Sequence, residues 1–278
     1  MGKLRAYVEL SRPKNALMSI LGALTGWMNS SSIYDERLIL TCLVPPLVLM
    51  AGNAINDYYD AEIDAINKPY RPIPSGRISK IEALNIYIIF SLLGVALSAL
   101  LGLLEFLIAA AFSLSWYIYA RWLKRTGIPG NALVSLGVAF TLVFGSLAAG
   151  NLTNKVMIFS SIAFTSNLIR EFVKAVEDLP GDKAYGVKTI AVRIGVERTG
   201  VLVSLLSLVV VVLTIIPVTL RLTGIIYLSL SVIISLSILM VASALCLKGK
   251  LGERARDVSN LIKASMFLGL LGMLLDPI

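Results

Sequence analysis

The sequence predicts an all-α membrane protein that crosses the bilayer with nine helices. Its 278 residues are 57% hydrophobic and only 15% charged, with a mean hydropathy of +0.83, whereas a soluble domain carries about 25% charged residues. Apolar runs of about 20 residues, the length of a membrane-spanning helix, recur along the chain. The nine predicted spans are residues 13–31, 38–58, 81–101, 104–122, 130–150, 154–174, 199–220, 223–247 and 258–276.

The distribution of Lys and Arg sets the orientation. With the N-terminus in the cytoplasm, the inside segments are 1–14, 58–80, 121–128, 170–198 and 247–263, and they hold 22 of the 25 Lys and Arg residues. The positive-inside rule is therefore satisfied, with the C-terminus outside. We expect a multi-pass protein of the cytoplasmic membrane. Its first span is too long for a signal peptide, and no clear cleavage site follows it.

Composition also excludes several kinds of site. The chain contains no histidine, which removes imidazole bases, most zinc sites and Ser-His-Asp triads. Its two cysteines, Cys42 and Cys246, lie inside apolar runs and are expected to be inert packing residues. The net charge of +8 reflects the topology rather than a nucleic-acid partner, because the basic residues are spread among the membrane loops.

The first and fourth spans each carry polar residues at their cytoplasmic ends. Arg12 precedes Pro13 at the start of the first span, and Asn15 follows one turn later. Lys124 lies after the fourth span, between Arg121 and Arg125. For these two arginines, interfacial anchoring beside Trp and Tyr is an equally good interpretation.

The second span ends in a polar helix face. If a helix turns about 100° per residue, five side chains between residues 51 and 64 fall within an arc of about 100°. They are Asn53, Asn56, Asp57, Asp60 and Asp64. Carboxylates this close repel one another unless a cation lies among them. Hard oxygen ligands of this kind suit Mg²⁺, which completes its shell with waters and phosphate oxygens.

The loop after this face adds Lys68, Arg71 and Arg77. Arginines are well suited to bidentate capture of phosphate oxygens. The alternative interpretation is a solvated helix end with ordinary surface charge. That alternative does not explain why the acids avoid the opposite face, where only Glu62 lies.

A second acidic segment follows the sixth span. Arg170, Lys174, Asp178 and Asp182 recur every four residues, and Pro180-Gly181 breaks the helix between the two aspartates. The two acidic segments lie four spans apart in the same orientation, so we expect both to meet at one cavity. The spacing suggests a single domain, 1–278, with a duplicated unit at roughly 11–125 and 128–250 and a ninth helix at 258–276.

This combination suits a metal-bridged diphosphate at the mouth of an apolar cavity. If the diphosphate is the head of a lipid, the tail can lie among the helices. The simplest reaction is then ionisation of the allylic C–O bond, with Mg²⁺ and the cations stabilising the charge on the leaving diphosphate. A water-poor pocket protects the allylic cation until an acceptor attacks it.

The motifs N-D-x-x-D-x-x-x-D from Asn56 to Asp64, R-P-I-P-S-G at 71–76 and D-x-x-x-D at Asp178 and Asp182 resemble those of the UbiA superfamily of intramembrane prenyltransferases. The resemblance covers most of the chain and implies nine helices around a central cavity, two Mg²⁺ ions held by the two Asp motifs, and a prenyl diphosphate donor. It also implies that Lys124 and Lys174 contact the diphosphate. Members of the family often carry a tyrosine where this chain has Arg170, which suggests a more anionic acceptor.

The residues of the expected site follow from the motifs and this resemblance. The expected metal ligands are Asn56, Asp57, Asp60, Asp64, Asp178 and Asp182. The expected diphosphate or substrate contacts are Arg12, Asn15, Asn53, Lys68, Arg71, Arg77, Lys124, Arg170 and Lys174. The expected catalytic residues are Asp60, Asp64, Asp178, Asp182 and Lys174.

Within the superfamily, the amino-acid sequences of these segments are most similar to those of the archaeal digeranylgeranylglyceryl phosphate synthases. These enzymes transfer a geranylgeranyl group to the hydroxyl of geranylgeranylglyceryl phosphate, which forms the second ether bond of archaeal membrane lipids. Arg170 would suit an acceptor that carries a phosphate. One alternative is an aromatic prenyltransferase that acts on 4-hydroxybenzoate or a quinone precursor. A more distant one is an ion-coupled transporter, whose carboxylates would lie nearer the bilayer midplane.

Overall fold

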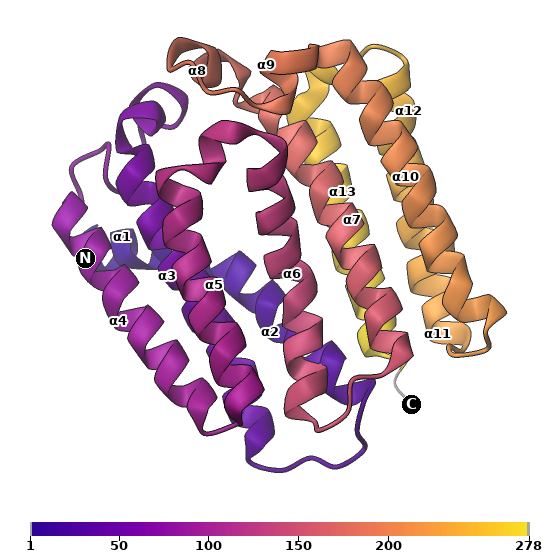
Figure 1. The fold of residues 1–278 in the computed structure, drawn as a ribbon. Helices are drawn as coiled ribbons and strands as arrows, with labels where there is room; N and C mark the ends of the chain where they lie inside the picture. The colour runs from indigo at the N-terminus through magenta and orange to yellow at the C-terminus, as the bar shows by residue number, and fades with distance from the viewer. Residues whose placement is uncertain (1, 277–278) are drawn as a thin grey trace.

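The computed structural model describes residues 2–276, apart from the side chain of Asn67, and every regular element within them is a helix (Figure 1). The long helices are α2 (Pro13–Met28), α3 (Arg37–Asn67), α4 (Lys80–Ala99), α5 (Leu103–Arg121), α6 (Ile128–Ala148), α7 (Asn154–Glu177), α10 (Val196–Thr219), α12 (Leu236–Leu247) and α13 (Leu251–Leu274). The short ones are α1 (Gly2–Ser11), η1 (Leu123–Thr126), α8 (Leu179–Ala184), α9 (Ile190–Ile194), α11 (Ile225–Tyr227) and η2 (Leu228–Ser235).

Eight helices of the described chain are long and apolar enough to cross a membrane. One of the eight is the continuous helix Ile225–Leu247, formed by α11, η2 and α12. The first predicted span corresponds to α2, which has only 16 residues. The all-α architecture is therefore confirmed. The count of nine spans stays a prediction, and so does the internal duplication that would relate residues 11–125 to residues 128–250.

Two helices, α3 and α13, extend well beyond their predicted spans. α3 continues without a break to Asn67, so the whole acidic motif is helical rather than partly in a loop. α13 begins at Leu251, seven residues before the predicted start, with a kink at Arg254 (φ −120°, ψ 24°). The predicted spans ended where the apolar run ended, but a helix can extend past the membrane into the aqueous layer.

The long connections lie together at one end of the bundle. The C-terminal end of α3, the loop to α4, η1, α8 and α9 all lie at the top of Figure 1, and the turns α2–α3, α4–α5 and α6–α7 lie at the bottom. α4 begins at this upper end with a capping box, in which Ser79 and Glu82 exchange hydrogen bonds. The two acidic segments are therefore on the same side of the membrane bundle.

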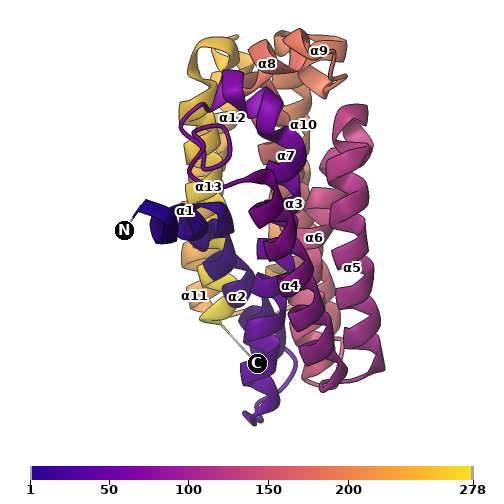
Figure 2. The ribbon, with the colours of Figure 1, turned by 90° about the vertical axis from the view of Figure 1, so that its left-hand side faces the viewer.

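The N-terminal helix α1 lies across the bundle rather than along it (Figure 2). Its buried face, Ala6 and Leu10, packs on Ala54 of α3 and on Ala83 of α4. The turn into α2 is made at Arg12, whose φ of 51° is unusual for a residue other than glycine. The sequence did not predict this turn, and it brings the Arg12 side chain back over α3.

A close helix contact joins α2 and α6 through glycines. A Cβ atom on Gly26 would lie 1.9 Å from the carbonyl oxygen of Leu142, and one on Gly145 would lie 1.9 Å from that of Ala23. Small residues at such crossings allow the backbones of membrane helices to approach closely. This contact fixes the spacing of two walls of the cavity described below.

We expect Gly145→Ala to destabilise the protein by about 1–3 kcal/mol, because the added methyl group must push α2 away from α6. A melting curve in detergent would measure this. Gly252→Ala is the matched control, since its Cβ would lie at an ordinary 3.5 Å from a Val196 methyl group. Equal melting temperatures for the two variants would contradict the close contact.

Candidate active site

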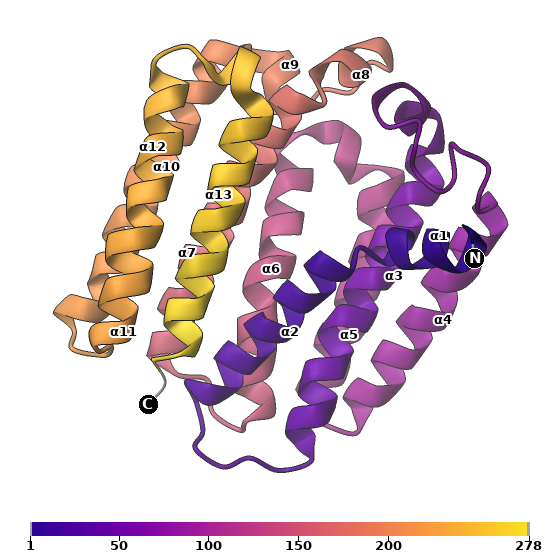
Figure 3. The same cartoon turned by 180° about the vertical axis from the view of Figure 1, so that it is seen from behind.

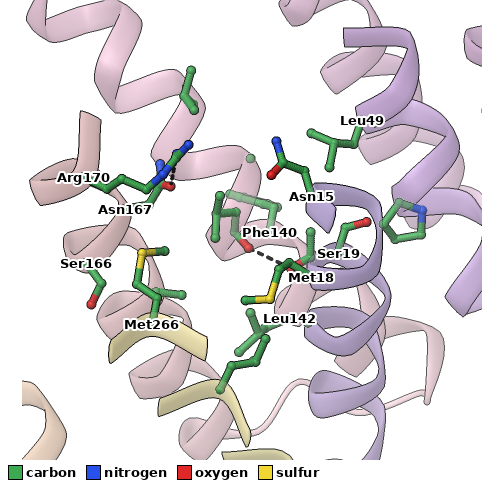
Figure 4. A pocket seen from close by; sticks show the side chains of 18 of the residues that line it. Asn15, Met18, Ser19, Leu49, Phe140, Leu142, Ser166, Asn167, Arg170 and Met266 are labelled. Atoms are coloured by element: carbon green, nitrogen blue, oxygen red, sulfur yellow. Dashed lines mark hydrogen bonds between the residues drawn. The ribbon is translucent and has the colours of Figure 1, made fainter. Parts of the chain in front are cut away.

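A cavity of about 650 Å³ lies between the helices and is lined by residues from both halves of the chain. Its deeper walls are apolar and include the aromatic side chains of Phe112, Trp116, Phe140 and Phe144. Figure 4 shows Asn15, Met18 and Ser19 of α2 on one side of the space, and Asn167 and Arg170 of α7 with Met266 of α13 on the other. The cavity thus has an apolar interior and a polar end.

The carboxylates of α3 are buried behind this polar end and do not themselves line the cavity, to which Asn56 connects Asp60. Asp57, Asp60 and Asp64 are each no more than 5% exposed. All three are paired with cations that come from other segments. The pairs are Asp57 with Arg12 and Arg71, Asp60 with Lys124, and Asp64 with Arg71. Buried carboxylates need such partners, because an isolated charge in a low-dielectric interior is strongly unfavourable.

An ion pair joins the end of the first acidic segment to the second, whereas their meeting at one cavity stays a prediction. The Nζ atom of Lys68, just after α3, lies 2.7 Å from a carboxylate oxygen of Asp178 at the end of α7. The helix breaks at Asp178, and Pro180 lies in the first turn of α8. Asp182 is buried in that short helix.

The two aspartates of the second segment have opposite pKa shifts. Burial raises the pKa of Asp182 to about 6, and the negative charge of Asp178 adds to this effect. Burial acts in the same direction on Asp178, but the charges of Lys174 and Lys68 outweigh it and lower its pKa. The surroundings of Asp182 therefore have too little positive charge to offset a carboxylate. This position suits a cation that binds together with the substrate.

Glu171 of α7 is a site residue that the sequence analysis did not select. It is 5% exposed, lines the cavity, and lies 2.9 Å from Arg170 and 3.9 Å from Lys174. The signal was present in the sequence R-E-x-x-K, which places Glu171 within one turn of both cations. Burial of that face, however, depends on how the neighbouring helices pack.

The remaining candidates divide into two groups. Asn15, Asn53 and Asn56 line the cavity, and the Asn56 amide donates to Asp60 over 2.7 Å. Arg77, in contrast, is not brought to the cavity. Its guanidinium binds both carboxylate oxygens of Glu9 at 2.7 and 3.2 Å, and this hydrogen-bonded pairing lowers the pKa of Glu9.

The acidic side chains of the site fit Mg²⁺ only together with further ligands. No group of three or more acidic, Cys or His side chains within residues 2–276 lies close enough together to hold a metal by itself. The carboxylate and amide oxygens of the two segments nevertheless suit Mg²⁺, which usually takes one or two protein carboxylates and receives its other ligands from water and phosphate. The residues therefore fit an ion that binds together with a substrate phosphate.

The chain is similar to known membrane prenyltransferases. Residues 16–271 match the model of the UbiA prenyltransferase family. The chain is 84% identical, over 100% of its length and 99% of the relative, to the digeranylgeranylglyceryl phosphate synthase of Korarchaeum cryptofilum. A solved structure of a digeranylgeranylglyceryl phosphate synthase is 34% identical and matches with a TM-score of 0.79 over 99% of this chain and 98% of that one.

A more distant structure shares the fold. It is a UbiA homologue from Archaeoglobus fulgidus bound to DMAPP and Mg²⁺, 19% identical, with a TM-score of 0.67 over 96% of this chain and 98% of that one. The matched family and the apolar helices make this a multi-pass membrane protein. The chain belongs to the UbiA prenyltransferase family.

Proposed function

We propose that this protein transfers a geranylgeranyl group from geranylgeranyl diphosphate to the free hydroxyl of geranylgeranylglyceryl phosphate. The product carries the second ether bond of an archaeal membrane lipid. The proposal rests on one observation: charged residues lie at the mouth of an apolar cavity. The chain that forms this cavity is 84% identical to a digeranylgeranylglyceryl phosphate synthase. The reaction takes place in the cytoplasmic membrane, with the long loops in the cytoplasm.

The chain's own residues bind the donor head. Lys124 and Lys174 hold the diphosphate oxygens, and Lys68 and Arg71 exchange their carboxylate partners for phosphate when the donor enters. Asp57, Asp60 and Asp64 on α3, with Asn56, and Asp178 and Asp182 on the second segment would hold two Mg²⁺ ions. When bound, Mg²⁺ neutralises the charge that develops on the leaving diphosphate.

The apolar cavity performs the other part of the reaction. It takes the prenyl tail and excludes water, which would otherwise capture the allylic cation. Trp116 and Tyr119 line the cavity below the acidic face, and aromatic faces attract a cation. Once the bond to the diphosphate has broken, the acceptor hydroxyl forms the new C–O bond with the allylic cation, and the hydroxyl proton goes to a diphosphate oxygen.

The acceptor is tested by offering two compounds in parallel. The purified protein, in detergent with labelled geranylgeranyl diphosphate and Mg²⁺, is expected to form product with geranylgeranylglyceryl phosphate and not with 4-hydroxybenzoate. EDTA should abolish the product. Product with the aromatic acid alone would overturn the acceptor and leave the prenyltransferase chemistry in place.

The two acidic segments are tested separately. Asp60→Asn and Asp182→Asn should each lower turnover by at least about 100-fold, since even residues that only support metal ligands cost 10–100-fold. Glu62→Gln is the matched control, because Glu62 is exposed on the opposite side of α3 and pairs with Lys80 at 3.6 Å. Normal turnover in either aspartate variant, with an unchanged elution profile, would remove that segment from the site.

The predicted donor contacts should separate binding from chemistry. Lys124→Ala or Lys174→Ala should raise the KM for geranylgeranyl diphosphate by about tenfold or more, because each loses a hydrogen bond to a charged group. Arg125→Ala removes an exposed charge next to Lys124 and should leave this KM within about twofold of the wild-type value. An unchanged KM in the lysine variants would show that they do not hold the diphosphate.

A further inference from the structure

A second group of cations lines the cavity on helices other than α3, which carries the paired aspartates. Lys14 on α2, Arg170 on α7 and Lys263 on α13 all line it, and so do the amides of Asn167 and Asn260. Figure 3 shows α2 and α13 on the same face of the bundle, and Figure 4 shows Asn15 and Arg170 facing each other across the space. Three different helices therefore direct positive charge at one side of the cavity mouth.

The lysines of this second group differ from those of the first in having no acidic partner. Lys68 and Lys124 are both paired with aspartates. Neither Lys14 nor Lys263 forms an ion pair with a carboxylate in the part of the chain that the structure describes. The polar contact of Lys263 is with the amide oxygen of Asn260 at 3.4 Å, a neutral group.

The group brings like charges to one cavity. Lys14 and Lys263 are exposed, so an anion that enters the cavity mouth can reach both of them. Like charges gathered at one site disfavour one another. A multiply charged anion between the three helices would remove the repulsion.

We propose that Lys14, Lys263 and Arg170 bind the phosphate group of the acceptor. This inference rests on the proposed function and deepens it, since it assigns the acceptor a binding site separate from that of the donor diphosphate. A phosphate monoester carries about −1.5 to −2 charges and three strong acceptor oxygens at pH 7, which matches one donor group from each of the three helices.

The position of Arg170 relates the two anion sites. It lies four residues, one helical turn, before Lys174 on α7, and its guanidinium donates to Glu171 over 2.9 Å and to Asn167 over 3.3 Å. Side chains one turn apart are separated by about 5–6 Å at their Cβ atoms. A phosphate at Arg170 would therefore leave the neighbouring glycerol hydroxyl near the donor carbon beside Lys174.

The same lysines could bind the phosphate of a bulk lipid headgroup, so the experiment separates the two sources. KM is measured for geranylgeranylglyceryl phosphate and for geranylgeranylglycerol, which lacks the phosphate, in neutral detergent and again in vesicles with anionic lipid. Lys263→Gln and Lys14→Gln should each raise the KM for the phosphorylated acceptor about tenfold in both media. The KM values for geranylgeranylglycerol and for the donor should stay within about twofold.

Two further variants complete the design. Lys263→Arg keeps the charge and should restore most of the affinity, whereas Lys250→Gln removes an exposed charge outside the cavity and should have no effect. Equal effects on both acceptors, no effect, or an effect confined to anionic vesicles would overturn the proposal. If the wild-type protein uses neither glycerol acceptor, the proposed function is overturned instead. The wild-type assay is therefore done before any variant is made.

Discussion

The site depends on the neutralisation of three carboxylates buried on one face of α3. Asp57, Asp60 and Asp64 are separated by three or four residues, so the helix alone places them together with nothing between them to offset their charge. The cations that offset it come from the turn between α1 and α2, the loop after α3, and η1 after α5. These three segments are held over the end of α3 by the same ion pairs that neutralise the acids.

The arrangement separates two environments that the proposed reaction needs side by side. The polar end of the cavity concentrates charge where a diphosphate can exchange with the existing partners. The interior offers an apolar, water-poor volume with aromatic walls, in which a prenyl tail is stable and an allylic cation is protected. The close approach of α2 and α6 at Gly26 and Gly145 fixes the width of that interior.

Much of this could be predicted from the sequence because helices impose simple rules. A fixed turn per residue places Asn56, Asp60 and Asp64 on one face, and the distribution of Lys and Arg indicates that both acidic segments lie on one side. Side chains outside long helices were harder to predict. Arg77 follows Gly76, whose φ of 71° turns the loop, and its guanidinium binds Glu9 instead of reaching the cavity.

Glu171 and the hinge at Arg12 escaped prediction for a related reason. Glu171 is part of the site because neighbouring helices bury its side of α7, and burial is a property of packing that periodicity does not report. Arg12 adopts a left-handed backbone conformation ahead of a proline, a strained arrangement that local preferences disfavour. Its ion pair with Asp57 supplies a tertiary reason for that conformation.

Charge balance links the ion pairs to the need for metal. The carboxylates of the site are Asp57, Asp60, Asp64, Glu171, Asp178 and Asp182. The cations among and beside them are Arg12, Lys68, Arg71, Lys124, Arg170 and Lys174. The two sets are equal in number, so the site without substrate is close to neutral. A diphosphate adds several negative charges that these six cations, already balanced by the six acids, do not offset. Divalent cations that enter with the donor restore the balance, which is the physical reason to expect metal and donor to bind together rather than the metal alone.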